Sequence, residues 1–322
     1  MSEATERTTL VTGASGFLGA HVAAAACARS QWEGTFSDPL GPLVVAQTRS
    51  PALLAPRFTT PRDAAQWIEQ DLLNGGAVQL LDRVRPTEVI HCAAMSRAAD
   101  CEADPDAAQA MNGVLPGAIA AWCAEHGARL VHISTDLVFG AEDAPRGGFQ
   151  ELAPPGPLSV YGMTKLAGER AALAAHPEAT IARLPLLYGN SGGRGLGASD
   201  AILEMVERSE LPTLFVDEWR TPLEVSNAAA ALVELLDFDQ PGPIHLAGST
   251  RTSRYDFGVA VLRAMGMPEG EARTAIQATV QSELNTGAPR PKDVSLNATL
   301  AKTNLETPLL NLREGLATYL GE

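Results

Sequence analysis

The chain has 322 residues, of which 45% are hydrophobic and 19% are charged, and its formal net charge at pH 7 is −14. This composition is that of a globular protein and excludes wholesale disorder, while the negative charge opposes binding to nucleic acid and to anionic lipid. An anionic ligand would therefore have to be held by local dipoles and a few arginines.

Strand-like and helix-like segments alternate along the first half of the chain. We predict strands over residues 8–12, 43–47, 88–92 and 129–134, and helices over residues 17–28, 64–69, 77–84 and 107–126. Residues 30–42, rich in Gly, Pro and Ser, are expected to form an enlarged surface loop. The alternation predicts an α/β protein with a Rossmann-type, doubly wound parallel sheet that is covered by helices on both faces.

The pattern changes after Tyr188. Residues 190–199 contain four glycines and one arginine. A helix near residues 200–208, a short strand near 214–216 and a helix over 227–236 are expected next. We therefore predict a Rossmann domain over residues 1–188, which includes the catalytic residues, and a smaller substrate-binding lobe over 189–322, some segments of which return to the Rossmann core.

A glycine-rich motif, Gly13-Ala14-Ser15-Gly16-Phe17-Leu18-Gly19, follows the first strand and opens the first helix. Glycines permit a tight turn and let backbone amides approach a pyrophosphate at the positive end of the helix. A simple glycine-containing turn is the alternative, but the position at the first βα junction favours a dinucleotide site. The expected cofactor contacts are Gly13, Ser15, Gly16, Phe17, Leu18 and Gly19.

The end of the second strand bears on the choice of cofactor. An NAD site usually has Asp or Glu here for the ribose hydroxyl, whereas this chain has Gln47-Thr48-Arg49-Ser50. Arg49 can pair with a 2′-phosphate, and Thr48 and Ser50 can add hydroxyl contacts. A solvated loop arginine is the alternative; we favour NADP(H) over NAD(H).

Two further strand ends are expected to contact the same cofactor. Asp71 and Leu72 follow the third strand region, a usual place for contacts to the adenine. Cys92, Ala93 and Ala94 are small residues at a strand end, which leaves room for ribose and phosphates.

Tyr161 and Lys165 carry the catalytic prediction. Residues four apart share one face of a helix, so Lys165 is expected to lower the pKa of the Tyr161 phenol from about 10 and to hold the nicotinamide ribose. Such a tyrosine can donate a proton to a carbonyl as hydride arrives, or accept one in reverse. Thr135, at a strand end in the same crevice, can hydrogen-bond the reacting oxygen. A surface helix pair is the alternative for an isolated YxxxK; the preceding motifs favour catalysis.

In order and content, these segments resemble the extended short-chain dehydrogenase/reductase superfamily, most closely the dTDP-4-dehydrorhamnose reductase family. The resemblance covers nearly the whole chain and includes residues 11–16, 91–94, 101–105, 132–136, 157–162, 168–169, 216–222 and 290–296. It implies a Thr135, Tyr161 and Lys165 triad, with NADPH reducing a 4-keto group on a nucleotide-linked deoxysugar and Tyr161 as proton donor. It also implies that Ser96 and Asn112 line or support the site and that Arg290 lies near the substrate lobe.

Two positions depart from that family. Leu137 replaces the aromatic of the usual STDYVF segment, and Leu186 replaces an aromatic in the segment over residues 183–188. Both positions face the substrate in relatives, and leucine cannot hydrogen-bond or stack as Tyr and Trp do. We therefore expect a nucleotide sugar or a related carbonyl compound rather than dTDP-4-dehydrorhamnose in particular. The expected substrate contacts are Ser96, Thr135, Leu137, Tyr161 and Leu186.

Two other functions remain open. The lost aromatics suit a cofactor-binding regulatory subunit resembling the β subunit of methionine adenosyltransferase, and the same scaffold also serves sugar-nucleotide epimerases and dehydratases. The only partner expected is a small molecule, with no nucleic acid, no membrane and no metal, although homodimers are common among relatives.

Localisation is predicted from three features that the chain lacks. It has no apolar run of ~20 residues, no basic-then-apolar order in residues 1–9, and no CxxC among its four cysteines. We expect a cytoplasmic protein with reduced thiols.

Overall fold

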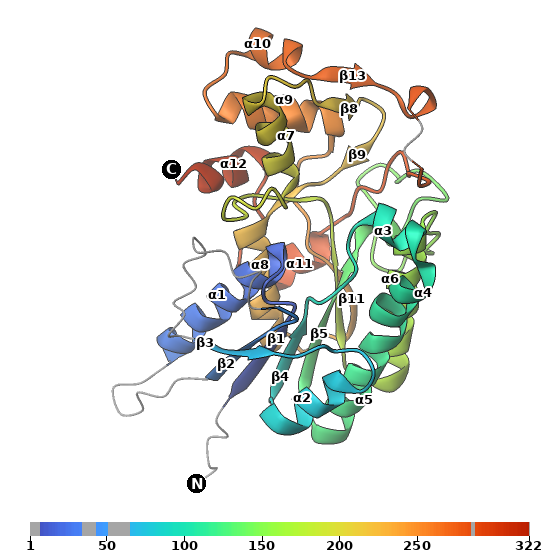
Figure 1. The fold of residues 1–322 in the computed structure, drawn as a ribbon, viewed down its shortest axis with the longest axis vertical. Coiled ribbons are helices and arrows are strands. Elements are labelled where there is room, and N and C mark those ends of the chain that lie inside the picture. The colour runs from blue at the N-terminus through green and yellow to red at the C-terminus, as the bar shows by residue number, and fades with distance from the viewer. Residues whose placement is uncertain (1–6, 34–42, 51–64, 285–286, 322) are drawn as a thin grey trace.

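The computed structural model describes residues 7–33, 43–50, 65–284 and 287–321. Within them, seven parallel strands form one central sheet in the order β11-β6-β5-β4-β1-β2-β3 (Figure 1). The strands are β1 (Thr8–Thr12), β2 (Leu43–Thr48), β3 (Ala65–Glu69), β4 (Glu88–His91), β5 (Arg129–Thr135), β6 (Thr180–Leu184) and β11 (Gly242–His245). This confirms the predicted fold class. The strand order reverses between β1 and β4, and in open α/β sheets ligands bind at such a switch point, beyond the carboxyl ends of the strands.

Helices cover both faces of the sheet because its strands are apolar on both sides. Leu10 of β1 packs with helices α2 (Gly76–Val84) and α5 (Leu115–His126), whereas its neighbour Val11 packs with α1 (Phe17–Glu33) and α8 (Val225–Glu234). Helix α6 (Val160–Ala175) lies beside α5 and carries Tyr161 and Lys165. The remaining helices of this part are α3 (Ala98–Ala103), α4 (Pro105–Ala108), η2 (Gln109–Val114), η3 (Asp136–Val138), η4 (Leu235–Asp237) and α11 (Thr299–Asn304).

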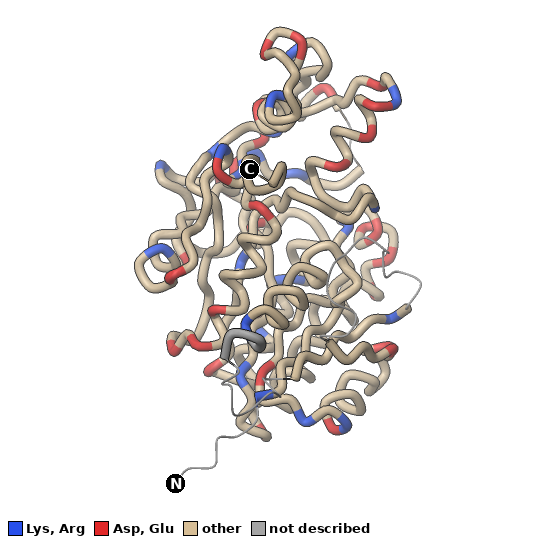
Figure 2. The backbone as a smooth tube through the Cα atoms, turned by 90° about the vertical axis from the view of Figure 1, so that its left-hand side faces the viewer, with Lys and Arg blue, Asp and Glu red and all other residues tan. Residues whose placement is uncertain are grey.

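A separate apolar cluster forms the core of the smaller part, at the top of Figure 1. Tyr188, Ile202, Phe257 and Leu316 are buried in it. Its elements are α7 (Ala198–Glu207), β8 (Thr213–Phe215), β9 (Trp219–Arg220), β12 (Thr252–Ser253), α9 (Arg254–Ala264), α10 (Glu269–Thr274), β13 (Gln277–Thr279), η5 (Gln281–Glu283) and α12 (Leu312–Leu320). Strands β7 (Leu187–Tyr188) and β10 (Leu223–Glu224) pair next to it. Acidic and basic residues are spread over both parts (Figure 2).

Three predicted elements differ in the structure. Residues 65–69 form the edge strand β3 rather than a helix, because a segment this short fits either period and its pairing with β2 decides. Helix α1 continues to Glu33, so residues 30–33 are helical rather than part of the predicted loop, and residues 34–42 lie outside the described residues.

The third difference is a π-helical turn, η2, within the helix predicted over residues 107–126. Pro116 cannot donate a backbone hydrogen bond to the Asn112 carbonyl, so the regular ladder is interrupted there. That carbonyl lies against Gly168 of α6, where an added Cβ would come within 2.1 Å of it. The interruption therefore lets the two helices approach closely.

Candidate active site

The glycine turn after β1 is shaped by the close approach of two backbones. Gly13 has a φ of 65°, and an added Cβ would lie 2.7 Å from the Ala93 backbone. The Gly13 amide donates to Gln47 Oε1 at 2.8 Å, and an added Cβ on Gly19 would lie 2.2 Å from the Gly13 oxygen. Only glycine fits at both places, which leaves the narrow backbone cradle that a pyrophosphate requires. The residues present therefore fit a dinucleotide.

The end of β2 supports this turn and carries an exposed arginine. Thr48 is buried and donates to Ser15 Oγ at 2.8 Å, and the Ser50 amide donates to Thr48 Oγ1 at 3.2 Å. Arg49, by contrast, is exposed and has no hydrogen bond or ion pair with any described residue. Of the three predicted contacts at this strand end, the Arg49 guanidinium is the group that is available to a ligand.

The other predicted cofactor residues differ in their accessibility. Leu72 is buried in the core between the sheet and α5, while Asp71 is exposed and accepts from the Leu73 amide at 2.9 Å. Residues 92–94 are half-buried and follow β4, with Ala93 directly against Gly13.

The glycine-rich segment after Tyr188 lies over the glycine turn. Arg194 donates to the Ser15 carbonyl, and an added Cβ on Gly197 would lie 3.0 Å from the Phe17 ring. Leu18 packs against the core beside α1. The two parts of the molecule therefore meet directly at the predicted cofactor site, which the sequence spacing alone did not indicate.

Thr135, Tyr161 and Lys165 come together at the carboxyl end of β5. Ser159 caps α6 by accepting from the Gly162 amide at 3.1 Å, which places Tyr161 in the first turn. An added Cβ on Gly162 would lie 2.3 Å from the Leu137 oxygen, so only glycine lets the helix start this close to β5. Thr135 lies close enough to the Tyr161 phenol to influence its pKa, and Lys165 donates to the Ile133 carbonyl of β5. The structure thus brings the three predicted residues to one edge of the sheet.

Burial shifts the pKa values of Tyr161 and Lys165 in opposite directions. Burial raises the pKa of Tyr161 above its usual value, against the lowering effect of the nearby Thr135 side chain. Burial lowers the pKa of Lys165 to about 8, and its ammonium donates to the Ile133 carbonyl. The Tyr161 pKa is therefore raised rather than lowered as expected, because loss of hydration is the largest influence on it.

A buried ion pair anchors α6 beneath this site. Arg183 on β6 binds Glu169 at 2.7 and 2.9 Å, and Ser134 donates to the same carboxylate. Asn112 joins α6 as well, since its amide donates to Thr164 Oγ1 at 3.3 Å and its oxygen accepts from the Met95 amide at 2.9 Å. Asn112 thus ties α6 to the segment that follows β4.

The remaining residues that were predicted to contact the substrate are either exposed or packed against one of the apolar cores. Ser96, one residue beyond Met95, is exposed. Leu137 packs against the core on the face of the sheet that α1 and α8 cover, and Leu186 packs against the separate core of the smaller part.

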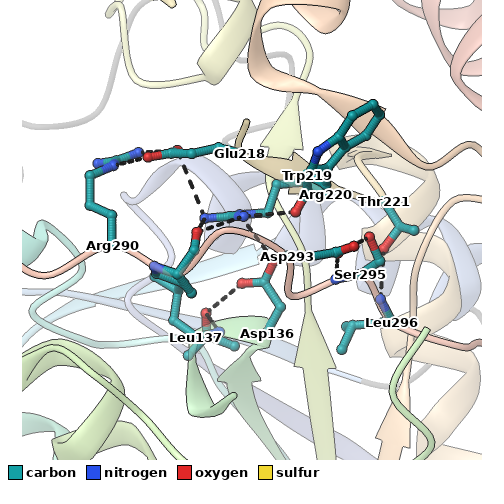
Figure 3. A network of polar contacts seen from close by, with 12 residues as sticks. Asp136, Leu137, Glu218, Trp219, Arg220, Thr221, Arg290, Asp293, Ser295 and Leu296 are labelled. Atoms are coloured by element: carbon teal, nitrogen blue, oxygen red, sulfur yellow. Dashed lines mark hydrogen bonds and ion pairs between the residues drawn. The ribbon is translucent and has the colours of Figure 1, made fainter. Parts of the chain in front are cut away.

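A network of charged side chains runs from Asp136, the residue after Thr135, into the smaller part (Figure 3). The Thr135 hydroxyl donates to Asp136 Oδ1 at 3.2 Å. Arg220 lies between two buried carboxylates, 3.9 Å from Asp136 and 3.9 Å from Glu218. Burial raises the pKa of Asp136 to about 6, against the opposing charge of Arg220.

Glu218 is fully buried and is bound more tightly on its other side. Arg290 donates to it from two nitrogens, with Nη2 at 2.7 Å from Oε2, and Gln281 donates at 3.1 Å. The resemblance implied that Arg290 lies near the substrate lobe, but it implied no role for Glu218 or Arg220, which fall within the matching residues 216–222. Nothing in the sequence shows that they meet Asp136.

Within the described ranges no three His, Cys, Asp or Glu side chains gather as a metal site would require. None of the helices described is both long and apolar enough to cross a membrane.

The strand order, the glycine turn at the switch point and the Tyr161 helix define this chain as an extended short-chain dehydrogenase/reductase, a class of oxidoreductases. The sequence model of the RmlD substrate binding domain matches residues 7–322, so the chain belongs to that family.

Relatives extend this result. The chain is 33% identical over 242 residues to a probable low-salt glycan biosynthesis reductase of Haloferax volcanii, covering 74% of this chain and 79% of the relative. It is 34% identical over 236 residues to the dTDP-4-dehydrorhamnose reductase of Mycolicibacterium smegmatis, covering 71% and 68%. It is also 31% identical over 262 residues to the rat methionine adenosyltransferase 2 subunit beta, covering 78% and 76%. The crystal structure of a dTDP-4-dehydrorhamnose reductase from Bacillus anthracis in complex with NADP has the same fold, with a TM-score of 0.77, 22% identity and coverage of 98% and 99%.

Proposed function

We propose that this chain reduces a keto group on a nucleotide-linked sugar, with NADPH as the reductant. The observation that carries the proposal is that Thr135, Tyr161 and Lys165 gather at the carboxyl end of β5, at the sheet edge that also holds the glycine turn. The family and the reductases among the relatives support it.

In this proposal the cofactor is held mostly by backbone. Residues 13–19 bind the pyrophosphate, residues 92–94 leave room for the ribose, and the exposed Arg49 pairs with a 2′-phosphate, which favours NADP(H) over NAD(H). When bound, NADPH supplies the hydride that reduces the carbonyl carbon. Residues 189–322 then act mainly as the substrate-binding lobe.

The proton is supplied by the chain itself. The raised pKa keeps Tyr161 protonated until a carbonyl oxygen gains charge beside it. The Tyr161 O–H bond then breaks, its proton passes to that oxygen, and the product is an alcohol. The ammonium of Lys165 and the hydroxyl of Thr135 stabilise the tyrosinate that remains.

A second function is favoured by one specific observation. The rat methionine adenosyltransferase 2 subunit beta shares 31% identity with this chain, and the leucines at positions 137 and 186 remove aromatic contacts to a substrate. A regulatory subunit would bind NADPH and reduce nothing.

NADPH oxidation against a panel of 4-keto nucleotide sugars tests the proposal. We expect turnover with at least one member, a loss of about 10²- to 10⁴-fold in kcat for Tyr161→Phe with NADPH affinity retained, and no loss for the control Tyr319→Phe in α12.

The other outcomes are distinct. NADPH binding without oxidation of any panel member would favour the regulatory subunit, and isomerised product without net NADPH consumption would favour an epimerase. Full activity of Tyr161→Phe would remove the tyrosine from the reaction.

A further inference from the structure

Asp136 holds the one hydroxyl proton of Thr135. Thr135 Oγ1 donates to Asp136 Oδ1 at 3.2 Å and accepts from the Leu137 amide, also at 3.2 Å. A threonine hydroxyl has a single proton, so a proton that is directed at Asp136 is not available to a reacting oxygen. In this arrangement Thr135 can only accept a hydrogen bond from the site.

The other oxygen of the Asp136 carboxylate depends on a cation. Oδ2 is buried and has no hydrogen bond with any described residue. Arg220 Nε lies 3.9 Å from it, which is too far for a hydrogen bond but close enough for a strong attraction between buried charges (Figure 3). Arg220 therefore stabilises the Asp136 carboxylate by its charge.

Arg220 is itself held in place by other groups. Its Nη1 donates to the Trp219 carbonyl at 2.7 Å and its Nη2 to the Pro291 carbonyl at 3.4 Å, while Glu218 lies 3.9 Å from Nη2. The position of the guanidinium thus does not depend on Asp136. Its positive charge stays beside the carboxylate when the Thr135 proton is directed elsewhere.

We propose that Asp136 and Arg220 are positioning residues, which hold the Thr135 hydroxyl until Tyr161 has donated its proton and then release it to the tyrosinate. This inference rests on the proposed function, since it describes how the same proton donor is stabilised. The Thr135 hydrogen rotates about the Cβ–Oγ1 bond from Asp136 Oδ1 to the Tyr161 oxygen, and no covalent bond changes. Arg220 then stabilises the carboxylate that has lost its hydrogen bond.

Steady-state kinetics with the accepted 4-keto nucleotide sugar test this role. We expect Arg220→Gln to lower kcat by about 10- to 100-fold, the size of one hydrogen bond to a charged group, because Asp136 then retains the Thr135 proton. In a Thr135→Val background the same substitution should cause no further loss, since no hydroxyl is left to release. Arg263→Gln, which removes the same charge from an exposed pair with Glu269, should match the wild type.

A double variant covers the case in which Arg220→Gln does not fold with Asp136 left unpaired. Asp136→Asn combined with Arg220→Gln removes both charges, and a neutral amide holds the Thr135 proton about half as strongly as a carboxylate. We expect kcat to return to within about 10-fold of the wild type, since the restored part is again one hydrogen bond to a charged group. A kcat that stays as low as in Thr135→Val would overturn the proposal.

The kinetic result would also overturn it in two other ways. An equal loss of kcat from Arg220→Gln with and without the Thr135 hydroxyl would show that Arg220 acts by another route. A rise in KM with kcat unchanged would assign Arg220 to substrate binding instead.

Methyl NMR of threonine-labelled protein gives a readout that needs no turnover. The Thr135 signal is assigned by its loss in Thr135→Val, and it should move in Arg220→Gln but not in Arg263→Gln, with the unfolding midpoint as the check on folding. A signal that moves, without turnover of any panel member, would retain the positioning of Thr135 and reject the reductase. Turnover with kcat and the Thr135 signal unchanged in Arg220→Gln would do the reverse.

Discussion

The two sides of the candidate active site are built from different chemistry. On the cofactor side, Gly13, Gln47 and Thr48 shape a turn with backbone and neutral side chains. On the substrate side, Arg220 and Glu218 belong to a buried network of full charges. The two sides thus differ in how they are built: close backbone approach shapes the glycine turn, whereas buried full charges hold together the segments beside Thr135.

The contrast between the two sides is not complete, because the Rossmann half also contains a buried pair of full charges. This pair, Glu169 and Arg183, stabilises the fold. We expect Glu169→Gln to lower the free energy of unfolding by about 3–5 kcal/mol, since Arg183 would be left buried without its partner. Chemical denaturation measures this. The control Glu204→Gln breaks an exposed pair with Arg208 and should cost under about 1 kcal/mol. Equal losses in the two variants would contradict the account.

The role of close backbone approach is tested at Gly13. Gly13→Ala should weaken NADPH binding by about 10- to 100-fold, because the strain and overlap with Ala93 amount to about 1–3 kcal/mol. Gly127→Ala is a matched control, since Gly127 has a φ of 67° but open space around its Cβ position. If both variants bind NADPH like the wild type, the turn does not depend on the approach of residue 93. Fluorescence titration of NADPH distinguishes these outcomes.

A smaller, pH-dependent effect on stability is expected from His245, the last residue of β11. Its Nδ1 lies 3.1 Å from the Phe149 carbonyl and its Nε2 3.4 Å from Arg183, so burial and the Arg183 charge lower its pKa to about 3. Below pH 6.5 the unfolded chain binds a proton here and the folded chain does not. The free energy of unfolding should therefore decrease as the pH is lowered. At pH 5 His245 should account for a loss of about 2 kcal/mol.

Denaturation at several pH values checks that contribution. His245→Gln should flatten the fall between pH 6.5 and 5 relative to the wild type. His126→Gln, which removes an exposed histidine, should keep the wild-type slope. An unchanged slope in His245→Gln would show that His245 is protonated in the folded protein.

The contiguous parts of the site were predictable from the sequence because short stretches of chain build them. The glycine turn over residues 13–19 and the spacing of Tyr161 and Lys165 are of this kind, and so are the strands that precede them. The ion pair of Glu218 and Arg290 joins residues 72 positions apart, and no local pattern indicates it. The strand β3 was missed because pairing with a neighbour, rather than its own five residues, determines its structure.

The pKa of Tyr161 could not be predicted from spacing either. Helical geometry places Lys165 one turn away, but the degree of burial sets the balance between hydration and charge, and burial depends on the packing of β5 against α6. The position of Arg220 between Asp136 and Glu218 is likewise set by the fold. Both features depend on tertiary structure.

The central claim is that NADPH bound at this site reduces a sugar carbonyl and that Tyr161 donates the proton. Isotope transfer tests this claim most directly. The wild type and Tyr161→Phe would be incubated with NADPH carrying deuterium on the transferred position and with the accepted 4-keto nucleotide sugar. The account predicts one deuterium on the former carbonyl carbon of the wild-type product, seen by NMR, and almost none with the variant. Product that contains no deuterium, or equal labelling by both proteins, would contradict it.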